Sequence, residues 1–352
     1  MPAEGHDRDA RAGGADDPRI TLLGPQRHPR LDAVSTSLGL HGARTATITA
    51  GWRDREGEDA VLTHQLGGRC VNLRLWERMQ LMWEADPELE RADRERRRVL
   101  TELQHLYVIG LEHAVEALIR IRAHQPRDQA VHRMAVEDIL GILRDLDDRH
   151  LSRVAELHEE FYATHQPHHR DAVLHGRAEV GRLVADCEAV AIAGGHVGVL
   201  LGALHIFNLA PVLAYPVPDE SAPRGVHARV HRPVIAWGAG AMALTERVML
   251  FYDDSVVAPG IAEVLMEGLG LTRGLVALPS ARERLDLRHA ERMQTLASRC
   301  RPLLPLLLDT DDQVTLTVDG RLPAGPRVVG PEGIPVRHDG ADPGATTPEE
   351  GA

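Results

Sequence analysis

The sequence predicts an α/β protein: a three-layer sandwich around a mostly parallel sheet, with a large helical insertion. Short apolar runs alternate with helical patterns on both sides of the middle of the chain, and several of these runs end at glycine. Strand signals stop in the middle, where apolar residues recur three and four apart. The divisions that we expect are a disordered leader, the first part of the α/β domain, the helical insertion, the second part of the α/β domain and a disordered tail: 1–18, 19–75, 76–185, 186–336 and 337–352.

The first part of the α/β domain contains two strand–helix units. Arg19–Leu23 is expected to be a strand that ends at Gly24-Pro25, and a helix is expected over Arg30–Leu38. Arg44–Ala50 is predicted to be the second strand and Cys70–Leu75 a third, short one. Two such units in succession favour a parallel sheet with crossover helices.

The insertion is charged and helical throughout. Prolines divide it into expected helices, which pack as hairpins against the sheet or against a second subunit. The helices are expected at 76–84, 88–123, 128–145, 147–164 and 170–185, with breaks near Pro87, Pro126 and Pro167.

The α/β pattern resumes with Ala189–Ala193, an apolar strand that leads through glycines into a helix over Val197–Phe207. Glu220–Arg232 is expected to be a loop. Val234–Trp237 is the next predicted strand, and it is followed by the four small residues Gly238–Ala241. Apolar residues at helical spacing then predict a helix that continues through Leu250. A buried strand, a sharp turn and a helix are the geometry of a nucleophile elbow.

The C-terminal part of the α/β domain is expected to add further strands. Leu275–Leu278 and Leu303–Leu308 are predicted strands, with a helix over Ala290–Arg299 between them. Val314–Val318 and Pro326–Val329 are expected to form an antiparallel pair.

Composition and charge exclude several classes of function. A formal charge of −12 argues against a nucleic-acid partner, which needs a basic surface. All 40 basic residues are arginine, so Schiff-base chemistry and a P-loop lysine are excluded. Three widely separated cysteines give neither a disulfide framework nor zinc spacing. No apolar run is long enough to span a membrane. We therefore expect a cytoplasmic, bacterial protein without cofactor, metal or membrane contact.

Ligands of parallel α/β sheets bind at the carboxyl ends of the strands, and four predicted ends carry unusual sequence. These are Gly194-Gly195-His196, Gly238–Ala241, Asp253-Asp254 and Pro279-Ser280. Two glycine-rich ends could offer backbone N–H groups to one developing oxyanion. The alternative is that these glycines only permit tight strand–helix turns.

Together these segments resemble peptidase family S51, which includes dipeptidase E and cyanophycinase and has the class I glutamine-amidotransferase-like fold. AWGAGAMAL resembles the W-S-A-G-A elbow of that family, and IAGGHVGVLL resembles its I-x-G-G-G-N-x-x-x-L segment. LVALPSA resembles the stretch that delivers the catalytic histidine. The resemblance implies an oxyanion pocket formed by Gly194, Gly195, His196 and Ala239, and an acid at Asp253.

The chain departs from the family where the catalytic side chains should be. Gly238 replaces the serine nucleophile, Ser280 replaces the histidine base, and His196 replaces a glycine of the oxyanion segment. A serine hydrolase needs an oxygen nucleophile and a base that takes its proton. The prediction is a catalytically degenerate relative that binds a small peptide-like or acyl-like ligand or a partner protein.

Two alternative functions stay open. One is an active amide or peptide hydrolase in which His196, Asp253 or His289 acts as a rearranged base and water is the nucleophile. The other is a structural subunit that assembles through its insertion, with a second copy or an active paralogue. His196 could equally be a partly exposed residue at a helix start, and Asp253 a solvated acid.

A metal site is not expected. Glu102 and His105 form a single E-x-x-H, half of the motif of di-iron bundles, and no second copy follows. A histidine cluster in the insertion lies around a proline loop without ligand spacing: His165, His168, His169 and His175. Cys187 precedes its strand, at the wrong end for a nucleophile, and is expected in the core.

Overall fold

The computed structural model describes residues 17–26, 30–220, 222, 225–251 and 261–341. Nearly all of the predicted leader, and the tail from residue 342 onward, lie outside these residues. Asp253 and Asp254 also lie outside them.

The main sheet has six strands in the order β12-β1-β7-β4-β2-β3. Neighbouring strands are parallel except β12 and β1, which are antiparallel. The mixed α/β class with a parallel-rich sheet is therefore confirmed. The strands are β1 (Ile20–Leu23), β2 (Thr45–Ile48), β3 (Cys70–Asn72), β4 (Ala189–Ile192), β7 (Val234–Trp237) and β12 (Gln313–Thr315).

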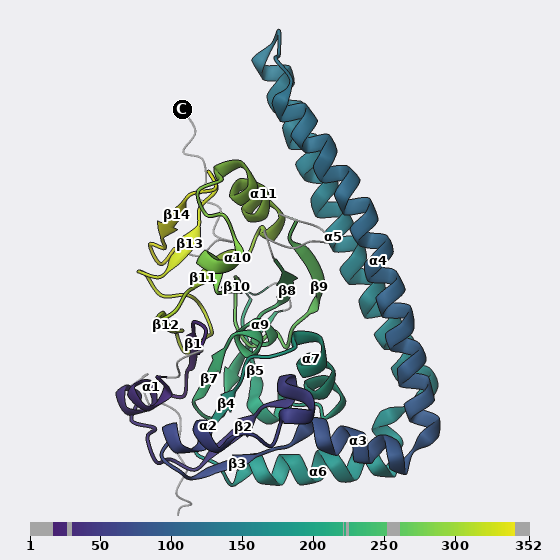
Figure 1. The fold of residues 1–352 in the computed structure, drawn as a ribbon, viewed down its shortest axis with the longest axis vertical. Coiled ribbons are helices and arrows are strands. Elements are labelled where there is room, and N and C mark those ends of the chain that lie inside the picture. The colour runs from purple at the N-terminus through teal and green to yellow at the C-terminus, as the bar shows by residue number, and fades with distance from the viewer. Residues whose placement is uncertain (1–16, 27–29, 221, 223–224, 252–260, 342–352) are drawn as a thin grey trace, which may run out of the picture.

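Helices cover both faces of the main sheet (Figure 1). β1, β2, β4 and β7 are buried along their whole length, as expected for parallel strands with two covered faces. Successive side chains enter different cores: Leu22 packs in the larger core and Leu23 in the smaller. The smaller core includes residues of α1 (Leu31–Ser37) and α2 (Ala60–Gln65), and the larger includes α7 (Val197–Ile206) and α9 (Ala239–Leu244).

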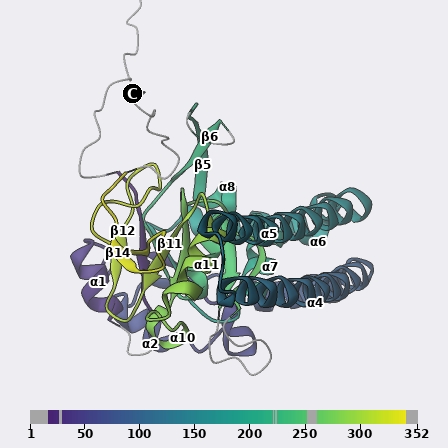
Figure 2. The ribbon, with the colours of Figure 1, turned by 90° about the horizontal axis from the view of Figure 1, so that it is seen from above.

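The later strands form a second sheet and two ribbons. The second sheet has the order β10-β11-β13-β14, with β10 and β11 parallel and the rest antiparallel. β5 pairs with β6 and β8 pairs with β9, both antiparallel, and the β5–β6 ribbon projects from the body in Figure 2. The bounds are β5 (Ala214–Pro218), β6 (Val226–Val230), β8 (Arg247–Leu250), β9 (Glu263–Glu267), β10 (Leu275–Pro279), β11 (Leu304–Leu308), β13 (Arg327–Val329) and β14 (Pro335–Arg337).

Three predictions about this half of the chain were wrong. Val314–Val318 does not pair with Pro326–Val329, because β12 pairs with β1 and β13 lies between β11 and β14. The expected loop Glu220–Arg232 contains β6. The helix after Gly238 does not reach Leu250: α9 ends at Leu244, and the chain continues as β8, whose partner is β9.

The insertion forms a long helical hairpin on a base of shorter helices (Figure 1). α3 (Leu75–Ala85) and α6 (Asp171–Ala185) lie at the base, and α4 (Pro87–Ala123) and α5 (Gln129–His165) have 37 residues each. At about 1.5 Å per residue each long helix spans roughly 55 Å. The hairpin rises along one side of the body and past α11 (Ala290–Cys300).

Both long helices begin at an aspartate whose side chain caps the helix. The Asp86 carboxylate accepts from Leu89 N, and the Asp128 carboxylate accepts from Ala130 N and Val131 N. The predicted break at residues 145–147 is wrong, because α5 continues through it. Within the part of the chain that the structure describes, no helix meets the length and hydropathy needed to cross a bilayer.

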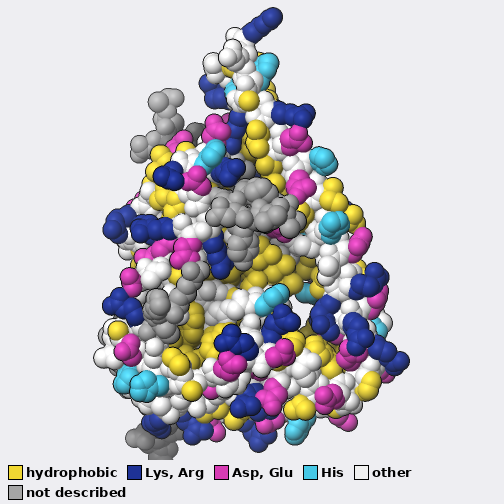
Figure 3. Space-filling model, in the orientation of Figure 1, with side chains coloured by type: hydrophobic (Ala, Val, Ile, Leu, Met, Phe, Trp, Pro, Cys, Tyr) yellow, Lys and Arg dark blue, Asp and Glu magenta, His cyan; other side chains and the backbone are white. Residues whose placement is uncertain are grey.

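Shorter elements complete the body: η1 (Ala50–Arg55), η2 (Pro167–His169), α8 (Ala210–Leu213) and α10 (Ala281–Arg284). Figure 3 shows hydrophobic side chains gathered in a hollow between the hairpin and the body.

Candidate functional site

The carboxyl ends of three neighbouring strands converge at one edge of the main sheet. β2 leads into Gly51, β4 into Gly194 and Gly195, and β7 into Gly238. His196 N donates to Gly51 O at 2.9 Å, which joins two of these ends. The glycine-rich segments that the sequence analysis singled out therefore meet in space.

The three ends are packed too closely for a side chain at position 195, and they leave little room for one at position 238. A Cβ on Gly195, whose φ is +127°, would lie 2.5 Å from the carbonyl carbon of Gly51. A Cβ on Gly238 would lie 3.2 Å from Gly194 Cα. Glycine at 195 is thus required by close backbone contact, as the tight-turn interpretation expects, whereas position 238 is tight but not closed.

Gly238 occupies the turn between β7 and α9 with φ 55° and ψ −127°. Residues with a side chain rarely adopt this region, and they do so mainly at functional sites. Its carbonyl accepts from Met242 N at 3.2 Å and so starts the helix. A buried strand, this turn and a short helix give the backbone geometry of an elbow, with only hydrogen where a nucleophile would be.

Two backbone N–H groups are available at this edge. Among the described residues, the N–H groups of Gly195 and Ala239 donate to no other backbone group. A Cβ built on Gly194 would lie 3.6 Å from Ala239 N, which places Gly194 beside that donor. Donors of this kind can stabilise a carbonyl oxygen or an oxyanion.

His196 is an exposed helix-start residue. It is the N-cap of α7, and its Nδ1 accepts from Val199 N at 3.2 Å. A neutral imidazole that accepts at Nδ1 carries its proton on Nε2 and has no second lone pair. His196 could therefore act as a base only by giving up the cap.

Ser280 lies in the second sheet, at the end of β10. Its backbone N donates to Leu308 O at 2.8 Å, its φ is +60°, and it is buried. None of its hydrogen bonds within the described ranges reaches Gly195, Gly238 or Ala239. The structure thus brings together Gly194, Gly195, His196, Gly238 and Ala239. Ser280 follows β10 of the second sheet, a strand that packs against α9, and Asp253 is outside the described residues.

The loop after β2 belongs to this edge and was missed by the sequence analysis. Gly51 directly follows the predicted strand Arg44–Ala50, and it contacts both glycines after β4. Arg53, two residues later, is exposed and has φ 60° and ψ −127°, close to the values of Gly238. The Gly-Trp dipeptide that follows the predicted strand Arg44–Ala50 is the sequence feature that could have indicated this loop as part of the edge.

A buried carboxyl anchors that loop to the insertion. Glu56, at the end of η1, accepts from Trp76 N at 3.1 Å and from Glu77 N at 3.0 Å at the start of α3. Burial raises the pKa of Glu56, and the two backbone donors partly offset this rise. Thr49 Oγ donates to Glu56 O at 3.1 Å. The loop beside the elbow is thereby fixed to the helical base.

Other features do not point to a metal. In the ranges that the structure describes, no three His, Cys, Asp or Glu side chains are grouped to hold one. Glu102 and His105 are both exposed, and Cys187 is buried. Cavities among the described residues lie away from the elbow. One of 460 Å³ lies beside the β5–β6 ribbon, and one of 430 Å³ lies between α4 and α11.

Comparison with known proteins finds similarity in structure and not in sequence. No protein-family model matches the chain, and no curated protein matches it, so the S51 resemblance stays a prediction from the motifs. Among solved structures, a peptidase from an acI-B1 Actinobacterium is similar at 12% identity and a TM-score of 0.41, over 92% of this chain and 94% of that chain. At this similarity, the activity of the chain has to be inferred from its own residues.

Proposed function

We propose that this chain is a degenerate relative of the S51 serine peptidases, which binds a small peptide-like or acyl-like ligand at the edge formed by β2, β4 and β7. The observation that carries the proposal is Gly238: its backbone has an elbow conformation, and it has no side chain. Glycine cannot form an acyl intermediate, so the proposed function is binding rather than hydrolysis.

The remaining groups fit this function. The N–H groups of Gly195 and Ala239 are donors that a ligand carbonyl or carboxylate can accept from. His196 is engaged as a helix cap, which argues against the alternative hydrolase with a rearranged base. The proposal therefore assigns recognition to backbone donors and gives no residue a role in proton transfer.

Gly194→Ala tests the binding site with little change to the fold. Its methyl group would lie 3.4 Å from Trp237 O and 3.6 Å from Ala239 N, which are ordinary contacts that place it beside the donor. Gly202→Ala in α7 is the matched control, because a Cβ there meets nothing within 4 Å.

The assay is a titration of the ¹⁵N-labelled protein with a panel of acetylated amino acids and dipeptides. We expect the amide resonances of Gly195 and Ala239 to shift with a member of the panel, without turnover. Gly194→Ala should abolish the shifts and Gly202→Ala should retain them. Unchanged resonances with the whole panel, or shifts that persist in Gly194→Ala, would contradict the proposal.

A second candidate function is assembly through the α4–α5 hairpin, with a second copy or a paralogue. It is favoured by large apolar side chains on the hairpin that are at least 42% exposed: Leu106, Ile109, Ile119, Val131, Met134 and Ile142. Light scattering on the full chain and on an Ile119→Gln/Met134→Gln variant tests it. Assembly predicts an oligomer that the variant lowers in mass, and a monomeric wild type would exclude self-assembly.

A further inference from the structure

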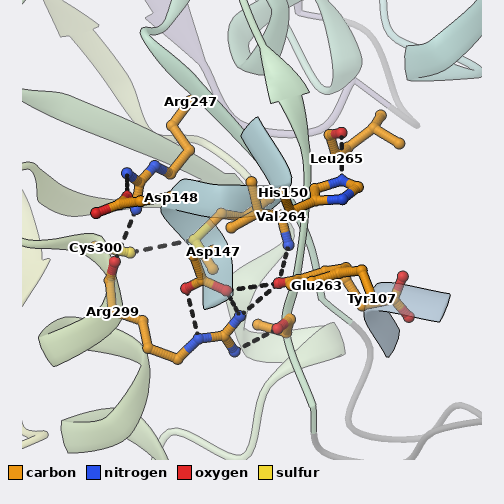
Figure 4. Close-up of polar contacts among 12 residues, drawn as sticks. Tyr107, Asp147, Asp148, His150, Arg247, Glu263, Val264, Leu265, Arg299 and Cys300 are labelled. Atoms are coloured by element: carbon orange, nitrogen blue, oxygen red, sulfur yellow. Dashed lines mark hydrogen bonds and ion pairs between the residues drawn. The ribbon is translucent and has the colours of Figure 1, made fainter. Parts of the chain in front are cut away.

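Side chains from the hairpin cover the outer edge of β9 in place of a neighbouring strand (Figure 4). Gln104 Nε2 donates to Val264 O at 3.2 Å, and Val264 N donates to Tyr107 Oη at 3.2 Å. His150 Nε2 lies 3.2 Å from Leu265 O. β9 pairs only with β8 within the described strands, so the hairpin satisfies polar groups that an edge strand would otherwise leave open.

A buried ion pair lies beside these contacts. Arg299 Nε donates to Asp147 Oδ2 at 2.9 Å, and Arg299 Nη2 donates to Asp147 Oδ1 at 2.8 Å. Tyr107 Oη donates to Asp147 Oδ1 at 2.6 Å and accepts from Arg299 Nη2 at 3.0 Å. Since Asp147 is 0% and Arg299 2% exposed, α4, α5 and α11 are joined by a pair that water does not reach.

Among the side chains of Gln104, Tyr107, Asp147, His150 and Arg299, only His150 has a buried polar atom without a hydrogen-bond partner in the described structure. Its ring stacks on Tyr107 with centroids 4.2 Å apart, and the residue is 2% exposed. Because Nε2 donates to Leu265 O, the lone pair is on Nδ1, and Nδ1 is buried without a hydrogen-bond partner among the described residues. A proton added there would make a buried cation with an N–H that has no acceptor.

We propose that this group of residues is an acid-sensitive latch: protonation of His150 releases the α4–α5 hairpin and uncovers the edge of β9. The charged groups around the ring compensate only in part for the loss of water. Asp147 on the same helix favours the added proton but is already paired with Arg299 of α11, and Arg153 opposes it. Glu263 of β9 accepts from Gln104.

The direction of the pH effect follows from burial. Burial lowers the pKa of His150, and the bond to Leu265 and the charge of Asp147 only partly offset this. The docked hairpin is therefore fully favoured above about pH 6.5, the ordinary pKa of histidine, and is weakened as the pH falls below it. The equilibrium constant for docking of the hairpin should fall by up to about tenfold for each pH unit below 6.5, until the pH reaches the pKa of His150 in the docked form.

Hydrogen exchange on the full chain tests the latch. The Val264 amide reports docking, because it donates to Tyr107 Oη, and the Val190 and Ile192 amides of β4 report the fold of the main sheet. Between pH 7.5 and pH 5 we expect the protection factor of Val264 to fall, by up to about tenfold per pH unit below pH 6.5, and to fall by more than those of the β4 amides. Constant protection at Val264, or an equal loss at Val264 and β4, would overturn the proposal.

Two variants and a control separate the latch from general acid sensitivity. His150→Gln keeps a donor toward Leu265 and does not titrate, so its Val264 protection should fall much less with acid than that of the wild type, and the fall that remains is due to His158 of the same helix. His231→Gln replaces an exposed histidine and should keep the wild-type response. If His150→Gln does not fold, His150→Phe keeps a ring stacked on Tyr107, leaves the acceptor of Val264 N in place and does not titrate. A fall in Val264 protection as large as that of the wild type, in either His150 variant, would refute the latch.

Discussion

Gly238→Ser places a side chain where the elbow has none. The new Cβ would lie 3.2 Å from Gly194 Cα, so the neighbouring backbone must move by a few tenths of an ångström. A residue with a side chain held at φ 55° and ψ −127° costs about 1–3 kcal/mol. We expect the variant to fold and to be less stable than the wild type by about 2 kcal/mol.

Urea unfolding followed by circular dichroism measures this difference. Gly202→Ser is the control, because position 202 is helical and open; this change should be neutral or stabilise by about 0.5 kcal/mol. Equal stability of Gly238→Ser and the wild type would refute the reasoning, since it would mean that the turn does not hold the strained conformation.

Three further predictions concern the packing and the buried charges. Gly240→Ala puts a Cβ 2.3 Å from Ile192 O and should cost about 2–3 kcal/mol, measured by urea unfolding. Asp147→Asn leaves the buried Arg299 charge without its partner and should cost about 3–5 kcal/mol in the same assay, with a smaller loss when Arg299→Met is added. Burial lowers the pKa of His158 to about 4, so the contribution of its neutral form to stability is complete above about pH 6.5 and is lost as the pH falls toward 4. We expect the free energy of unfolding to fall by about 3 kcal/mol over this range, measured by unfolding at a series of pH values. His158→Gln should not show this fall, and the same pH dependence in the variant would contradict the prediction.

The strands of the main sheet could be predicted because their sequence signals are local. Val234–Trp237 is a β-branched run between a proline and a glycine, and the structure gives the same bounds. Asp86-Pro87 marks the start of α4 because an aspartate cap and a proline at the first turn favour helix initiation. These features need no knowledge of distant partners.

Local sequence patterns could not predict which distant segments pair as strands. The apolar residues from Met242 to Leu250 fit a helix, but the chain changes to β8 at Arg247 because β9 pairs with it. β12 pairs with β1, so Thr315 lies opposite Thr21 from the other end of the chain. Nothing in the periodicity of either segment specifies its partner.

The candidate site was predictable only in part, for a related reason. The glycines after β4 and β7 could be identified together because they form a motif, and they do meet. Gly51 and Arg53 lie at the same edge but carry no motif, and the strain at Arg53 is a property of φ and ψ that the sequence does not display. The position of His196 at a helix start was one of the two interpretations of the sequence, but the use of its Nδ1 as the cap is a feature of the folded chain.

Reaction with a fluorophosphonate probe, read by intact mass and peptide mapping, tests the central claim most directly. The wild-type chain should show no adduct at residue 238 and no hydrolysis of a model peptide, because the elbow has no oxygen to phosphonylate. Gly238→Ser combined with Ser280→His should acquire an adduct at position 238. Stoichiometric labelling of the wild type, or hydrolysis by the wild type that is lost in His196→Ala, would contradict the account.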